Sequence, residues 1–144
     1  QYLLAAISHD RVVLFHISSK PVDFFLFNTF IFKLSQKVNT SNQNKTFFLF
    51  DNATFHNLNE ATESELLKKN IHITKTAPLG SFANPIEEFF SIVHFYFIQI
   101  LSNRILYEDS YISNIEYVQF IKKAVEKASR KCNYLLIYAR AGIT

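Results

Sequence analysis

The chain has 144 residues, of which 49% are hydrophobic, which suits one folded domain with a sizeable core and excludes a disordered chain. Its formal net charge of +3 is compatible with a polyanionic partner, and net charge bears on association, not on fold. One cysteine, Cys132, excludes an internal disulfide framework and a cysteine-based zinc site, and favours an intracellular, reducing compartment.

The first part of the chain predicts a β-hairpin followed by a helix. Residues 2–7 and 11–17 are rich in β-branched and aromatic side chains and flank a short polar segment, which is typical of two connected strands. In residues 22–38, apolar side chains recur at helical spacing just after Pro21, a residue suited to a helix N-terminus. The many phenylalanines in this predicted helix indicate core packing more than a ligand site.

The rest of the chain alternates between strands and helices. Residues 46–50 form a short, continuous apolar run, typical of a strand that is buried on both faces. Residues 59–70 predict a polar helix, and residues 71–74 predict another short strand. Further helices are predicted over residues 85–101, 115–130 and 134–139. This order predicts an α/β domain in which a mixed β-sheet is flanked by helices.

No segment of the sequence predicts a membrane span or a signal peptide. The longest apolar-rich stretch, residues 91–101, contains His94 and Gln99 and is shorter than a bilayer requires. The apolar start of the chain is interrupted at once by polar and charged residues, unlike a signal peptide. We therefore expect no membrane partner and an intracellular location.

The first candidate functional residue, Asp51, comes directly after the strand predicted at residues 46–50. Asn52 and His56 follow it closely. In open α/β sheets, ligands and catalytic groups gather outside the carboxyl ends of strands, so Asp51 is a candidate acid. A structural role is the alternative, because an aspartate after a strand often forms a turn by accepting hydrogen bonds from nearby backbone N–H groups. An isolated histidine is likewise more often packed than a ligand.

The second candidate acid, Glu87, lies at a predicted helix start. In the segment Asn84-Pro85-Ile86-Glu87, Asn84 is suited to the N-cap and Pro85 to the first helical position. Glu87 could complete a capping box, in which its carboxylate accepts a hydrogen bond from the N-cap amide. If Glu87 instead meets Asp51, the two carboxylates form a pair able to hold a divalent metal ion.

In combination, these motifs resemble the catalytic domain of DDE-type transposases of the Tc/mariner superfamily. The resemblance rests on the strand followed by Asp51, Asn52 and His56, and on the segment from Asn84 to Glu87. The separation of the two acids, 36 positions (87 − 51), is also similar. The likeness extends to the flanks, at Ala5-Ala6-Ile7-Ser8, Val12-Val13, Phe90-Ser91 and Arg140-Ala141-Gly142.

The resemblance implies a fold and a chemistry. It implies that residues 1–144 are one partial DDE endonuclease domain with an RNase H-like fold, whose first strand and first catalytic acid lie upstream of Gln1. Asp51 and Glu87 would then be the second and third catalytic acids and would bind Mg²⁺ or Mn²⁺. Such domains use two metal ions to clamp the attacking and leaving oxygens of a phosphodiester. With one acid absent, we expect this segment alone to be inactive.

The resemblance also implies partners and supporting residues. The DNA partners would be the transposon ends and the target, joined in DNA transposition and integration, with a homodimer of the full-length protein and a nuclear location. Asn52, His56 and Asn84 would support the metal-binding acids.

Two other interpretations remain open. A catalytically dead or domesticated transposase remnant would keep the fold and bind nucleic acid or protein without chemistry. An unrelated α/β module would use Asp51 only as a turn former and Glu87 only as a helix cap.

Overall fold

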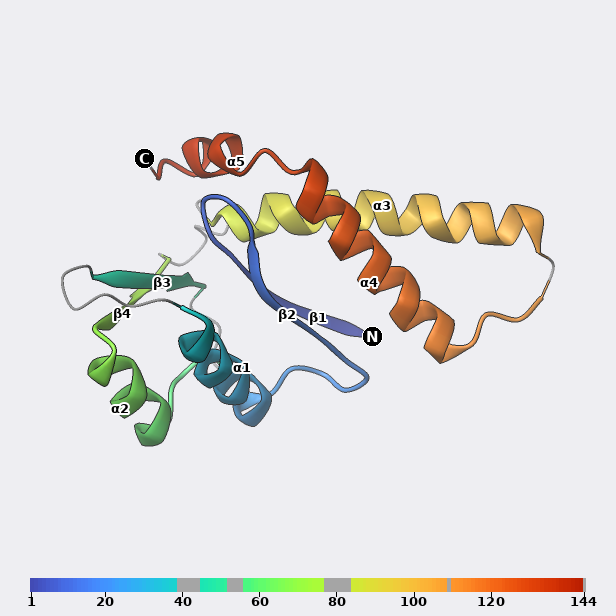
Figure 1. The fold of residues 1–144 in the computed structure, drawn as a ribbon. Helices are drawn as coiled ribbons and strands as arrows, with labels where there is room; N and C mark the ends of the chain where they lie inside the picture. The colour runs from blue at the N-terminus through green and yellow to red at the C-terminus, as the bar shows by residue number, and fades with distance from the viewer. Residues whose placement is uncertain (39–44, 52–55, 77–83, 109, 144) are drawn as a thin grey trace.

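In a computed structural model of the chain, the described residues are 1–38, 45–51, 56–76, 84–108 and 110–143. After an initial hairpin, helices and strands alternate, and the chain ends with three consecutive helices among the described residues (Figure 1). In chain order the elements are β1 (Tyr2–Ile7), β2 (Val12–Ser18), α1 (Phe24–Lys37), β3 (Thr46–Phe50), α2 (Glu60–Lys68), β4 (Ile71–Lys75), α3 (Pro85–Tyr107), α4 (Asn114–Lys131) and α5 (Tyr134–Arg140). The predicted α/β class and the predicted order of elements are confirmed.

The hairpin of β1 and β2 forms the middle layer of the fold. The strands pair antiparallel, and the Ser8 amide donates a hydrogen bond of 2.8 Å to the Arg11 carbonyl at the turn. Alternate side chains of β1 point to opposite faces, as the period of a strand requires. Leu4 and Ala6 pack against one hydrophobic core, and Leu3, Ala5 and Ile7 pack against the other. Helices therefore cover both faces of the hairpin.

β3 and β4 form a second sheet, and their pairing is parallel, from Thr46 opposite Ile71 to Phe50 opposite Lys75. A parallel pair needs a crossover connection, and α2 provides it. The described strands thus form two separate two-stranded sheets, where one mixed sheet was predicted. The two sheets are not joined because no described strand lies between them to bond with both.

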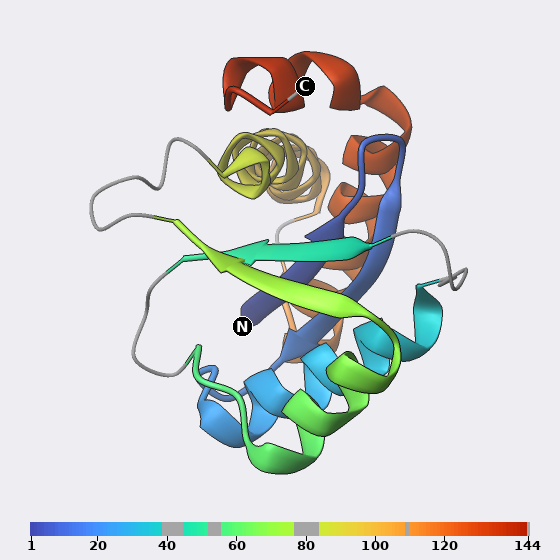
Figure 2. The same ribbon diagram turned by 90° about the vertical axis from the view of Figure 1, so that its left-hand side faces the viewer.

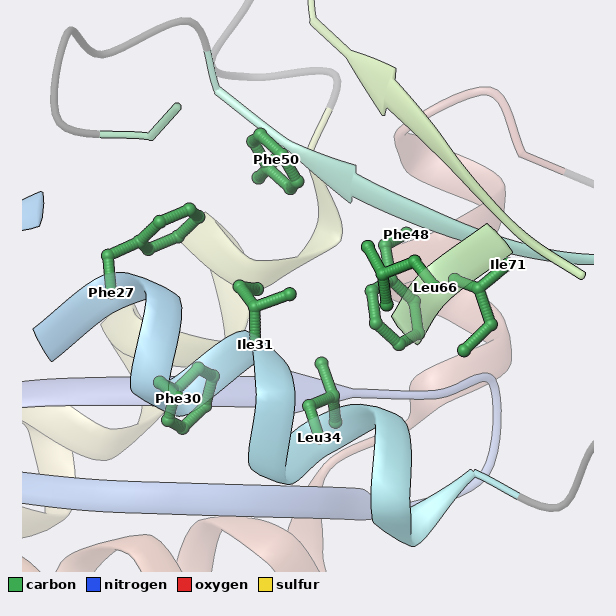
Figure 3. Close-up of a cluster of buried hydrophobic side chains, with 8 residues drawn as sticks. All are labelled: Phe27, Phe30, Ile31, Leu34, Phe48, Phe50, Leu66 and Ile71. Carbon is green, nitrogen blue, oxygen red and sulfur yellow. The ribbon is translucent and has the colours of Figure 1, made fainter. Parts of the chain in front are cut away.

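The first hydrophobic core joins the two sheets through α1 and α2. The buried side chains come from α1, β3, α2 and β4, and Figure 3 shows them converging: Phe27, Phe30, Ile31, Leu34, Phe48, Phe50, Leu66 and Ile71. Hairpin residues such as Leu4 and Leu14 pack against the same core. Both sheets therefore lie against one helical layer, although they share no hydrogen bonds among the described strands.

The second core lies on the opposite face of the hairpin, under α3, α4 and α5 (Figure 1). Phe89 and Ala124 are fully buried there. α3 continues to Tyr107, past its predicted end at residue 101. Arg104 lies in this added part, and its Nη1 donates a 2.9 Å hydrogen bond to the Glu108 carbonyl at the helix end. Basic groups are favourable in the last turn of a helix.

At this length, α3 meets the size expected of a membrane-spanning helix, which the sequence did not predict. Among the described helices, α3 is long and apolar enough to cross a membrane when judged by length and composition alone. In the fold, however, it packs through Phe89 and Val93 against the hairpin and α4. Much of its remaining apolar surface is exposed, at Phe95, Ile98, Ile105 and Leu106.

Candidate metal site at the carboxyl end of β3

Asp51 lies where the parallel ladder of β3 and β4 ends. The Thr76 amide donates a 3.0 Å hydrogen bond to the Phe50 carbonyl, so the backbone pairing extends to the residue before Asp51. Phe50 is buried beneath this position, and the Asp51 side chain is 43% exposed. The strand therefore presents the Asp51 carboxylate at a sheet edge that solvent and small ions can reach.

His56 pairs with Asp51. Its Nδ1 forms an ion-pair contact with Asp51 Oδ1, and its side chain is 13% exposed. The imidazole stacks on Phe27 of α1, with ring centroids 4.3 Å apart, and meets Phe50 edge-on at 5.8 Å. His56 is thus held between two aromatic rings of the first core with one nitrogen directed at Asp51. This arrangement orients the carboxylate, the role expected of a group that supports a metal-binding acid.

Asn28, a residue that the sequence analysis did not single out, holds the segment that carries His56. Asn28 lies on α1 and is 3% exposed. Its Nδ2 donates to the Asn57 carbonyl at 2.9 Å, and its Oδ1 accepts from the Asn59 amide at 2.8 Å. The signal in the sequence was a polar residue beside Phe27 on an otherwise apolar helix face. Its significance depended on knowing what that face contacts.

Glu87 lies in the first turn of α3, as predicted. Asn84 is the N-cap: its Oδ1 accepts a 3.1 Å hydrogen bond from the Ile86 amide, and Pro85 follows as the first helical residue. The Glu87 backbone amide donates to the Asn84 carbonyl at 3.1 Å. In the described structure no hydrogen bond joins the Glu87 carboxylate to the Asn84 amide, so the capping box considered for Glu87 is not formed.

α4 shows what a complete capping box looks like in the same molecule. The Ser113 amide donates to Glu116 Oε2 at 3.0 Å, and the Glu116 amide donates to Ser113 Oγ at 3.2 Å. That hydrogen bond from the Ser113 backbone is the main reason why the pKa of Glu116 is lowered. By contrast, the exposed carboxylate of Glu87 is not engaged in capping its own helix.

Glu88, the residue after Glu87, has a partner from the end of the chain. Its Oε1 lies 2.5 Å from Nη1 of Arg140 at the end of α5. Burial, and then the charge of Glu88, raise the pKa of the nearby Cys132 thiol. The two adjacent acids of α3 therefore differ, because Glu88 forms an ion pair with Arg140 of α5 and Glu87 is exposed.

The carboxyl ends of β3 and β4 point toward the part of the domain where α3 begins. The arrowheads of β3 and β4 lie toward the start of α3 in both Figure 1 and Figure 2. Residues 77–83, which connect β4 to α3, and the candidate Asn52 lie outside the described residues. Among the residues that are described, no group of three or more His, Cys, Asp or Glu side chains is arranged to hold a metal ion.

The chemistry open to this arrangement follows from its donor atoms. Carboxylate oxygens are the ligands that Mg²⁺ prefers, and that ion keeps several waters and needs few protein ligands. A comparison with protein-family models, with curated proteins and with solved structures found no match. The functional interpretation therefore rests on the residues and geometry of this chain, together with the resemblance of its motifs.

Proposed function

We propose that this chain is the larger part of a DDE-type transposase catalytic domain, which cleaves DNA and joins its strands with Mg²⁺ or Mn²⁺. The observation that supports it best is the environment of Asp51. This carboxylate follows the last residue of a parallel strand pair, is partly exposed, and is oriented by a half-buried histidine. The exposed Glu87 lies in the first turn of α3, and α3 begins on the side of the domain toward which β3 and β4 run.

The proposed fold is an RNase H-like sheet with one further strand between β1 and β3. A strand joined to the start of β1 by a tight turn would run antiparallel to β1 and pair along its outer edge. For an acid at the carboxyl end of that added strand to lie near Asp51, the strand must also run parallel to β3 and pair with the unpaired edge of β3. Among the described strands, both of these edges are unpaired, and both sheets pack on the same core.

In the proposed reaction, Asp51 and Glu87 would hold the metal ions, and His56 keeps the Asp51 carboxylate in its orientation. When bound, the ions would supply the positive charge that stabilises the attacking and leaving oxygens of a phosphodiester. Asn84 contributes by beginning α3 at Pro85, which fixes Glu87 in the first turn. A third carboxylate, from the strand that precedes the hairpin, would complete the ligand set.

Iron-directed cleavage of the protein backbone tests whether the two acids share an ion. Fe²⁺ replaces Mg²⁺ at such sites, and with ascorbate and peroxide it generates radicals that cut the nearby polypeptide. We expect cuts near both residue 51 and residue 87 at millimolar Fe²⁺, suppressed at both places by excess Mg²⁺. Asp51→Asn or Glu87→Gln should abolish both cuts, whereas the neighbouring control Glu88→Gln should leave them. Cuts at one position only, or at neither, would overturn the shared site.

Catalysis is tested in a version of the protein that includes the strand preceding the hairpin. Glu87→Gln should abolish Mn²⁺-dependent nicking of supercoiled DNA, and Glu88→Gln should retain it. Nicking by the Glu87→Gln protein would refute the proposed role of this acid. DNA binding without nicking by the unsubstituted protein would favour the alternative, a remnant that binds nucleic acid without chemistry.

A further inference from the structure

One third of the chain's 15 basic residues lie within ten consecutive positions of α4. Residues 122–131 include five basic side chains and one acidic one, a net charge of +4, against +3 for the whole chain. The remainder of the chain is therefore close to neutral and slightly acidic. The basic residues are Lys122, Lys123, Lys127, Arg130 and Lys131.

Four of these five cations are exposed and unneutralised. Lys127 is half-buried, with its ammonium 4.9 Å from the centre of the Tyr96 ring. The other four are exposed, and none of them forms an ion pair with any described residue. This holds even for Lys122 and Arg130, which flank Glu126 at the helical spacing of four residues that favours pairing. The outer face of α4 therefore carries a local positive field.

Helix stability explains only part of this pattern. Arg130 and Lys131 lie in the last turn of α4, where cations interact favourably with the helix dipole. Lys122 and Lys123 lie near the middle of the helix, where that effect is absent. Their charges are therefore not accounted for by the helix dipole and are available to a polyanionic partner.

We propose that this outer face of α4 (Lys122, Lys123, Arg130 and Lys131) binds the phosphate backbone of duplex DNA. The proposal deepens the proposed function and rests on it, because it assigns a surface to the DNA partner. Nine positions of an α-helix span about 14 Å, enough to contact several phosphates of one duplex, whose major groove is about 12 Å wide. Contacts of lysine with phosphate position DNA without reading its sequence.

A membrane is the less suitable polyanion. A helix that binds the surface of a bilayer inserts its apolar face among the lipids. The apolar face of α4 is already used, since Ala124, Val125 and Ala128 are between 0% and 1% exposed in the second core. The charged face alone is available to a partner, which favours a ligand recognised by charge.

The test compares two variants of the 144-residue chain with the same change in charge. In one, Lys122, Lys123 and Arg130 are replaced by glutamine. In the control, Lys33, Lys37 and Lys68, which are exposed on α1 and α2, are replaced by glutamine. Binding of a labelled duplex of arbitrary sequence is measured by fluorescence anisotropy in EDTA, from low to moderate salt. Circular dichroism verifies that both variants remain folded.

The α4 variant should bind duplex DNA at least about tenfold more weakly at low salt, and the slope of log K against log salt should fall by roughly 2 to 3. The control should change much less. Equal losses in both variants, or no loss in either, would overturn the proposal. So would a wild-type chain that ignores DNA but binds anionic phospholipid vesicles through α4.

This assay separates the inference from the proposed function because it needs no metal ion. DNA binding that depends on α4, combined with no metal-dependent nicking, would leave the inference standing and reject the catalytic role. Wild-type binding that the α4 variant retains would reject the inference alone.

Discussion

Replacing Asn28 with alanine should destabilise the fold and loosen the segment that carries His56. Asn28 is 3% exposed, and its amide makes two long-range hydrogen bonds, to the Asn57 carbonyl and from the Asn59 amide. Each intramolecular hydrogen bond contributes about 1 kcal/mol, and a buried group left without a partner costs about 1 to 3 kcal/mol. The Asn59 amide is partly buried at the start of α2, so we expect a total loss of about 2 to 3 kcal/mol.

The measurement is urea unfolding followed by circular dichroism, with Thr29→Ala as the matched control. Thr29 is the next residue on α1, is exposed, and donates only to the Phe25 carbonyl of its own helix at 2.9 Å. Its replacement should cost less than about 0.5 kcal/mol, as for most surface substitutions. If Asn28→Ala unfolds within about 0.5 kcal/mol of Thr29→Ala, the role assigned to this amide is wrong.

Three further outcomes can be checked on the same chain. Phe89→Ala should cost about 3 to 5 kcal/mol in denaturant unfolding, because Phe89 is fully buried, whereas Phe95→Ala, at 57% exposed, should cost far less; equal losses would contradict the described second core. Because burial raises the pKa of the Cys132 thiol, alkylation by iodoacetamide should accelerate at a higher pH in the folded chain than in urea, and coincident profiles would refute this. The pKa of Glu116 is lowered in the folded chain, so its ionised carboxylate stabilises the fold above the pKa of the unfolded carboxyl, and this stability is lost as the pH falls through the lowered value. In Glu116→Gln, the free energy of unfolding should therefore fall less steeply at acidic pH than in the wild type. An unchanged dependence on acidic pH would contradict this.

The sequence was most informative where the signals are local. The N-cap at Asn84 and the helix start at Pro85 could be predicted because capping depends on residues a few positions apart. The strand at residues 46–50 could be predicted from a continuous apolar run, and this placed Asp51 at its end. These features depend on residues that are close in the sequence, and tertiary packing did not change the secondary structure that those residues favour.

Long-range features could not be predicted in the same way. The contact between Glu88 and Arg140 joins residues 52 positions apart, and nothing local in either segment indicates it. The stacking of His56 on Phe27 depends on how α1 lies against β3. The division of the strands into two sheets likewise depends on which edges meet, a property of the whole chain. For the site, the positions of Asp51, His56 and Glu87 were predictable from local motifs, and the contacts from α1 that hold His56 and the following segment were not.

The unpaired edges of β1 and β3 make this fold an acceptor for an added strand. An exposed strand edge offers a row of backbone donors and acceptors to any extended peptide of suitable length. Among the described strands, both edges are unpaired, and the two sheets pack on one shared core. The domain is therefore suited to strand complementation, in which a synthetic peptide supplied separately docks and raises the melting temperature.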